Sequence, residues 1–158
     1  MDGWYYLHTN GDLIYKRDLE STAADIRESD FARALWPLDT TDRAGAWRIC
    51  VEALAAGANP SRVKELAVKW ECDDTDADQY ATFIGARVYR DGNQWCATTG
   101  NFINLQESPA GFGITKLEAF AELAKALGYR PSKMWGASFA DLVQAESAVM
   151  DTVGGTHV

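Results

Sequence analysis

Two turn dipeptides constrain the fold of this chain more than any other feature of its sequence. Asn10-Gly11 and Asp91-Gly92 are strong signals for a tight β-hairpin, because both central residues of a type I′ turn need a positive φ. The first dipeptide lies inside an aromatic-rich hairpin predicted over residues 3–17. The second joins two predicted strands in the middle of the chain, so a second antiparallel pair is expected there.

Predicted helices stand on either side of three predicted strands. The second hairpin covers residues 86–90 and 94–98, and residues 102–106 are predicted as the third strand. A helix over 75–86 precedes these strands. A helix over 115–128 follows them, with a Thr-x-x-Glu capping box at its start and a glycine after its last turn.

Two local details of this segment are also predicted. Tyr80, Phe83 and Ile84 are expected to turn inward from the helix that precedes the strands. The Gly-Phe-Gly run at 111–113 is expected to form a turn before the helix that follows them. This run is too short to cradle a phosphate group.

The order helix, three antiparallel strands, helix matches the topology of the double-stranded-RNA-binding fold. An RNA-binding domain of this kind needs a cationic start to its last helix, where it grips phosphates. Here that helix begins with a single lysine, Lys116, which is offset by Glu118. Because topology does not carry function with it, RNA binding stays a secondary hypothesis.

Helices are predicted for most of the remaining chain. Residues 21–36 predict a helix that stops before Pro37, because the residue before a proline disfavours the α region. Residues 40–58 and 59–70 predict two further helices, the second with an asparagine cap and a proline in its first position. Residues 138–149 predict a last helix with a Ser-x-x-Asp box.

These elements predict an α+β protein with a single domain over residues 1–150. An N-terminal β-hairpin and a helical middle occupy residues 1–72. A helix–three-stranded antiparallel sheet–helix unit follows over 73–130, and a closing helix lies within 131–150. Residues 151–158 are expected to form a flexible tail.

Charge and composition limit the partners and the location of the chain. Its 158 residues carry a net charge of −8. We therefore expect no face that binds the phosphates of a nucleic acid, and no binding to an anionic membrane surface. No run approaches the roughly 18 apolar residues of a membrane span, and the N-terminus does not resemble a signal peptide. Three widely spaced cysteines fit buried thiols in a reducing cytoplasm.

No motif of the sequence predicts catalysis. The histidines are His8, in a predicted strand, and His157, near the end of the chain, and the sequence contains no nucleophile elbow or phosphate loop. The acidic run over 73–78 resembles part of a calcium loop but lacks the mid-loop glycine and the closing glutamate. We therefore predict no enzyme activity, no metal and no cofactor.

One acidic segment carries five carboxylates within eight positions and no cation: Glu71, Asp73, Asp74, Asp76 and Asp78. Two or three of them would serve a helix start, where a Thr75-x-x-Asp78 capping box is predicted and each charge stabilises the helix by ~0.3–1 kcal/mol. Five exceed what a cap requires, because neighbouring like charges repel. A role in binding a basic partner and a role in solubility both stay open.

A second acidic segment covers residues 18–42, where seven carboxylates face two arginines, a net of −5. Localised charge of this kind steers a basic partner. The partner contacts predicted in this segment are Asp18, Glu20, Asp25, Glu28 and Asp30. Lys16 and Arg17 end the first hairpin, and a contact between them and the acidic patch of a second copy predicts a homodimer.

Two segments resemble small accessory proteins of proteobacterial phages and prophages. They are residues 29–58 and residues 101–123, the latter containing the run NLQESPAGFG, and the resemblance extends over residues 4–142. At this size and acidity the chain resembles type I-F anti-CRISPR proteins. That resemblance implies a non-enzymatic inhibitor of the crRNA-guided surveillance complex or of its recruited helicase-nuclease, and it assigns no role to any residue.

The resulting hypothesis is a phage-encoded inhibitor that acts in the cytoplasm of a bacterial host. Its acidic segments would meet a basic surface of a host Cas protein, without direct contact to nucleic acid or membrane. Two alternatives stay open. One is an antitoxin-like phage regulatory module, and the other is a divergent double-stranded-RNA-binding-like domain.

Overall fold

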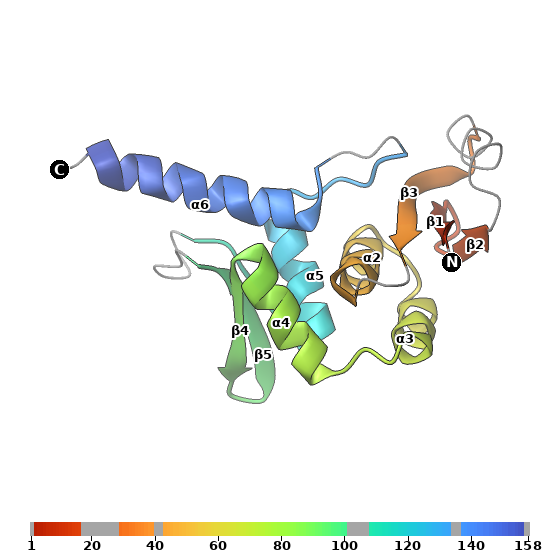
Figure 1. The fold of residues 1–158 in the computed structure, drawn as a ribbon, viewed down its shortest axis with the longest axis horizontal. Coiled ribbons are helices and arrows are strands. Elements are labelled where there is room, and N and C mark those ends of the chain that lie inside the picture. Colours follow the sequence, from red (N-terminus) through yellow and green to blue (C-terminus); the bar gives the residue numbers. More distant parts are fainter. Residues whose placement is uncertain (1, 17–28, 40–42, 101–107, 134–136, 157–158) are drawn as a thin grey trace.

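The computed structural model describes residues 2–16, 29–39, 43–100, 108–133 and 137–156. Figure 1 shows two groups of strands at opposite sides of the body, with helices between them. The α+β class predicted from the sequence is confirmed. No helix among the described residues is long and apolar enough to cross a membrane.

The N-terminal sheet consists of three antiparallel strands in the order β2-β1-β3. Strand β1 spans Asp2–His8 and pairs with β2, Leu13–Lys16, so that Tyr5 lies opposite Tyr15. The Asn10-Gly11 dipeptide forms the turn, with Gly11 at a φ of 93°. The predicted first hairpin is therefore confirmed.

Strand β3, Ala32–Asp39, corrects the helix predicted over 21–36. Residues 21–28 lie outside the described part of the chain, and residues 32–36 form an edge strand. Ala34 and Trp36 pack into the main core, whereas Leu35 packs against Trp4 on the other face of the sheet. A strand that is buried on both faces loses the alternation of polar and apolar residues, so its sequence resembles a helix.

Two helices connect this sheet to the rest of the molecule. Helix α2 spans Arg43–Ala55, and helix α3 spans Pro60–Lys69. The predicted cap of α3 is confirmed, because the Asn59 side chain accepts a hydrogen bond from the Ser61 N–H at 3.0 Å. The Asn59 N–H in turn donates to the carbonyl of Gly11 at 2.8 Å, which ties the hairpin turn to the start of α3.

The second sheet lies between two helices, in the order predicted. Helix α4, Asp74–Ile84, leads into β4, Ala86–Asp91, and β5, Gln94–Thr99, and helix α5 spans Lys116–Ala126. The strand order is β4-β5-β6, with antiparallel pairing throughout. The predicted αβββα order is confirmed, although its third strand lies elsewhere than expected.

The third strand, β6, is Ala110–Gly113, where the sequence predicted a turn. The strand predicted over 102–106 lies outside the described residues. A Cβ at Gly111 would clash with the backbone of Ala119 and Leu123, and a Cβ at Gly113 would clash with the start of α5. These glycines do not form the predicted turn. They allow α5 to lie directly on β6.

The last helix, α6, spans Phe139–Thr156. Its predicted capping box is confirmed, because Ser138 and Asp141 exchange hydrogen bonds of 2.9 Å and 3.2 Å. The helix continues beyond residue 149 and through most of the segment predicted as a tail over 151–158. Figure 1 shows its C-terminal half extending away from the other helices and strands.

A cluster of aromatic rings joins the helices in the core. Phe120 of α5 is fully buried and lies 5.7 Å from Tyr80 of α4 and 6.3 Å from both Trp47 of α2 and Phe139 of α6, measured between ring centroids. Edge-to-face pairs of this kind stabilise by ~0.5–1.5 kcal/mol each beyond their buried area. One residue on α5 therefore links four helices.

We predict that Gly111→Ala lowers the free energy of unfolding by about 3 kcal/mol or more. The added methyl group must push α5 away from β6, and overpacked sites of this kind cost ~1–3 kcal/mol even where the backbone yields. Gly92→Asn is the control, because Gly92 has open space around it and asparagine tolerates its positive φ. Urea denaturation measures the stability of both variants, and equal stabilities would contradict the prediction.

Candidate functional site

The predicted acidic surface begins with a helix cap. Asp73 precedes α4 and accepts a hydrogen bond from the Asp76 N–H at 3.0 Å, while the Asp76 carboxylate accepts one from the Asp73 N–H at 3.0 Å. This capping box lies two residues before the predicted pair Thr75 and Asp78, so that prediction was wrong. The helix starts earlier because Asp73, in an extended conformation, already satisfies its first orphan N–H groups.

Asp78 pairs with a lysine from another helix. Its carboxylate lies 2.9 Å from the Nζ of Lys116, whose side chain is only 8% exposed. The same Nζ lies 4.7 Å from the centroid of the Trp95 ring, and Arg90 lies near the same ring at 5.4 Å. This arrangement ties α4, α5 and β5 together and neutralises one charge of the acidic segment.

The other predicted contacts are placed only in part. Glu71 is exposed and has a φ of 54°, and for Asp74 only the backbone is described. Asp30 and Lys16 are exposed at the ends of β3 and β2. The remaining predicted residues lie outside the described part of the chain: Asp18, Glu20, Asp25, Glu28 and Arg17. The structure thus brings Asp73 and Asp76 together and places Asp78 against Lys116. The roles predicted in partner and dimer contact stay predictions.

Phe83 lies on the outer face of α4, which corrects the prediction that it turns inward. Its side chain is 71% exposed. The buried residues Ala77, Tyr80, Ala81 and Ile84 already complete the three- and four-residue spacing of the inner face. Phe83 comes immediately before Ile84, so it is rotated by about 100° from that buried residue around the helix and faces solvent. A large exposed aromatic side chain near carboxylates is a common anchor in protein interfaces.

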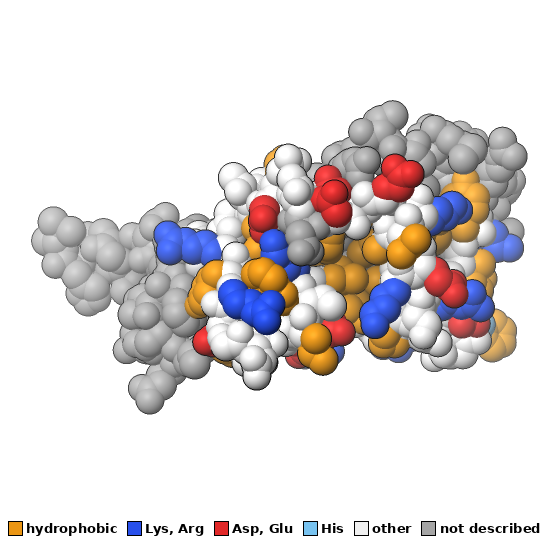
Figure 2. Space-filling view, turned by 90° about the horizontal axis from the view of Figure 1, so that it is seen from below, with side chains coloured by type: hydrophobic (Ala, Val, Ile, Leu, Met, Phe, Trp, Pro, Cys, Tyr) orange, Lys and Arg blue, Asp and Glu red, His pale blue; other side chains and the backbone are white. Residues whose placement is uncertain are grey.

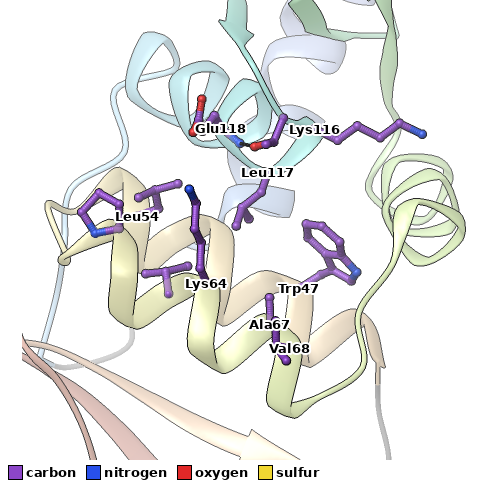
Figure 3. A pocket seen from close by; sticks show the side chains of 11 residues that line it. Trp47, Leu54, Lys64, Ala67, Val68, Lys116, Leu117 and Glu118 are labelled. Carbon is purple, nitrogen blue, oxygen red and sulfur yellow. Dashed lines mark hydrogen bonds between the residues drawn. The ribbon is translucent and has the colours of Figure 1, made fainter.

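An apolar groove of about 290 Å³ is the feature that sequence reasoning missed. It lies between α2, α3 and the first turn of α5, and Figure 3 shows Trp47, Ala67 and Leu117 around it. In Figure 2 hydrophobic side chains gather in the middle of one face, between the region of α3 and the region of β4 and β5. No motif marks the groove, because it forms only where α5 packs beside α2 and α3, from which it is distant in sequence.

A buried carboxylate lies in the core. Glu52 of α2 is 1% exposed and accepts a hydrogen bond from Arg48 Nε at 2.8 Å, with further hydrogen bonds to the Trp36 side chain and the Phe139 backbone. Burial raises the pKa of Glu52, and the nearby Arg48 guanidinium opposes that rise. Through these hydrogen bonds Glu52 connects β3 and α6 to α2.

The thiols of the described residues show no sign of nucleophilic activation. Cys50 and Cys96 are buried, as predicted, and Cys72 is half-buried. Burial raises the pKa of the Cys50 thiol, which keeps it protonated and unreactive. Within the described ranges, no three His, Cys, Asp or Glu side chains form a group that could hold a metal ion.

No family model, curated protein or solved structure matches this chain. The functional inference therefore depends on the exposed face of α4 and on the charges around it.

We predict that Lys116→Met lowers the free energy of unfolding by about 1–2 kcal/mol. The change removes both the ion pair with Asp78 and the cation–π contact with Trp95, from a site where the lysine is nearly buried. Lys125→Met on the same helix is the matched control, because its pair with Glu122 is half exposed on both sides and is worth less than about 0.5 kcal/mol. Equal effects in thermal denaturation would contradict this prediction.

We predict that Glu52 makes the protein less stable as pH rises. The folded state raises the pKa of Glu52 above its ordinary 4.5, so between 4.5 and the raised pKa the folded state binds more protons than the unfolded state. Stability therefore falls with rising pH across that window. Glu52→Gln removes this term, so the stability of the wild type relative to the variant should fall as the pH rises above 4.5 in urea titrations. Parallel pH profiles of the two proteins would contradict the assignment.

Proposed function

We propose that this chain is a non-catalytic protein-binding module, encoded by a phage, that inhibits a type I CRISPR effector of its host. The proposed target is a basic surface of the surveillance complex or of its helicase-nuclease. The observation that carries the proposal is the outer side of α4, where the carboxylates of its first turn and the exposed ring of Phe83 belong to one helix.

The charge on this side of α4 is smaller than the sequence alone suggests, but it is not cancelled. The positive end of the helix offsets about half a charge, and Lys116 offsets one more. The Asp73 side chain stays exposed while it accepts its capping hydrogen bond from the Asp76 N–H.

Phe83 supplies the part of the interface that charge alone does not. Rim charges set the rate and specificity of association, whereas buried aromatic anchors carry most of the affinity. Tyr89 is a further exposed aromatic residue, on β4, and α4 packs against that strand.

The αβββα order favours a double-stranded-RNA-binding-like domain as the second candidate. Its charge argues against that function, because the lysine at the start of α5 is buried against Asp78 and Trp95 and is not free to contact a phosphate. An antitoxin-like module and the homodimer contact through Lys16 and Arg17 stay hypotheses. Co-purification of a toxin from host lysate, or a clear gel shift with duplex RNA, would favour these alternatives.

We predict that purified type I-F surveillance complex or helicase-nuclease binds this protein, and that Phe83→Ser weakens binding about tenfold or more. Phe83 is exposed, so the variant should fold normally. Phe31→Ser is the matched control, because Phe31 is also exposed but lies beside β3, on the N-terminal sheet. Affinity should also fall between ~0.15 M and ~1 M salt, where the Debye length shrinks from ~8 Å to ~3 Å. Binding to neither Cas component would refute the proposal.

A further inference from the structure

Strand β4 forms an open edge of the second sheet. One side of it pairs with β5 along all six residues, Ala86–Asp91. Among the described residues, no backbone group makes a hydrogen bond to its other side. The remaining edge strands are shorter or already engaged, since β2 and β6 have four residues each and β3 donates the Leu35 N–H to the Ser132 carbonyl. An edge of this kind is a ready template for another strand.

The pairing with β5 determines which backbone groups of β4 point outward. The Gly100 N–H donates to the Gly85 carbonyl at 3.0 Å, and the register continues from there along β4 without a shift. Hydrogen-bonded and non-hydrogen-bonded pairs alternate along an antiparallel ladder. Counting from Gly85, residues 87, 89 and 91 therefore bond to β5. The N–H and C=O groups of residues 86, 88 and 90 point away from β5, toward the open edge.

This alternation leaves few registers for a second copy of the chain on the same edge. A shift by one residue would set outward groups of one copy against residues of the other that bond to β5. One allowed antiparallel register places Tyr89 opposite Tyr89 of the second copy on a two-fold axis. Val88 then lies opposite Arg90, and Arg87 lies opposite Asp91. The allowed registers two residues away lose both pairs of Arg87 with Asp91.

The charges on the outer face of this edge complement each other in that register. Arg87 and Asp91 lie on the same face of the strand as Tyr89, one on each side of it. Both are exposed, and neither makes an ion pair among the described residues. The paired residues of β5 on that face carry no formal charge: Gln94, Cys96 and Thr98. Two-fold symmetry would thus convert four unpaired charges into two ion pairs.

The third charge of the strand, Arg90, lies on the opposite face. Its Nε donates to the Gly92 carbonyl at 3.1 Å, and its guanidinium lies 5.4 Å from the centroid of the Trp95 ring. In the same register it lies opposite Val88 of the second copy. Arg90 therefore meets no like charge directly across the edge, where such a pair would be destabilising.

We propose that two copies of this chain associate through β4 in an antiparallel, two-fold contact that joins their second sheets. Backbone hydrogen bonds and the pair of Tyr89 rings supply the attraction, and the pairs of Arg87 with Asp91 set the register. The contact goes beyond the proposed function, and it differs from the dimer contact predicted for Lys16 and Arg17. Because the interface is small, the dimer forms reversibly.

The test measures the mass of the intact protein by sedimentation equilibrium between about 1 μM and about 1 mM. The wild type should change from monomer to dimer in that range. Arg87→Glu and Asp91→Arg each set like charges opposite one another twice, and each should weaken dimerisation about tenfold or more. Both positions are exposed, so the variants should fold normally, as circular dichroism would show.

A mixture of the two variants separates pairing in register from a general effect of charge. Each variant supplies the charge that the other lacks at both positions, so an equimolar mixture of Arg87→Glu and Asp91→Arg should recover the dimer. Lys64→Glu is the matched control. It makes the same change of charge on α3, which lies far from β4 in Figure 1, and it should alter dimerisation less than about twofold.

Arg90→Pro tests the backbone part of the contact. The Arg90 N–H points away from β5, so proline removes a hydrogen bond to the second copy and none to β5. Arg90→Ala is its control, because it loses the same contacts with Gly92 and Trp95 but keeps the N–H. The proline variant should be monomeric at concentrations where the alanine variant still dimerises.

Several results would overturn the inference. The wild type could stay monomeric at every concentration, its dimer could be insensitive to Arg87→Glu and Asp91→Arg, or the mixture of the two variants could fail to recover it. A dimer that Lys16→Glu dissociates and Arg87→Glu leaves intact would assign the association to the first hairpin instead.

Discussion

The close packing of α5 on β6 is the constraint on which the rest of the structure depends. Gly111 and Gly113 bring the helix backbone against the strand, and Phe120 then reaches the rings of three other helices. A larger residue in the strand would lift α5 and pull Phe120 out of this cluster. The same placement of α5 sets Leu117 across from α3, which creates the groove, and aims Lys116 at Asp78.

Carboxylates of the acidic segment stabilise the fold and also lie at the surface of the protein. Asp73 and Asp76 cap α4, and Asp78 holds Lys116 over Trp95. Such contacts account for much of the acidic segment. Glu52 shows the opposite case, because its charge is buried and balanced by Arg48 and contributes little to any surface.

The two surfaces with binding potential differ in their chemistry. The outer face of α4 combines negative charge with Phe83, whereas the edge of β4 combines outward backbone groups with Arg87 and Asp91. A dimer through β4 would carry the α4 face twice, once on each copy. The rigid core beneath them means that neither surface needs to form at the moment of binding, which lowers the entropic cost of association.

Local interactions let the sequence by itself determine much of this fold. The Asn10-Gly11 turn, the Asn59 cap and the Ser138–Asp141 box depend on residues within a few positions of one another, and all of them are present. The second predicted hairpin is present as well, but it turns at Gly92 and Asn93, because Asp91 still pairs with Gln94 in the sheet.

Tertiary structure alone decided the features that depend on distant neighbours. Residues 32–36 form a strand because side chains on both faces of this segment are buried. Residues 110–113 form a strand because α5 packs directly on their glycines. Phe83 faces solvent because other residues of α4 already fill the inner face. The groove has no sequence signature, because it forms where α5 packs beside α2 and α3 from a distant part of the chain. Rules that compare near neighbours in the sequence do not detect such packing.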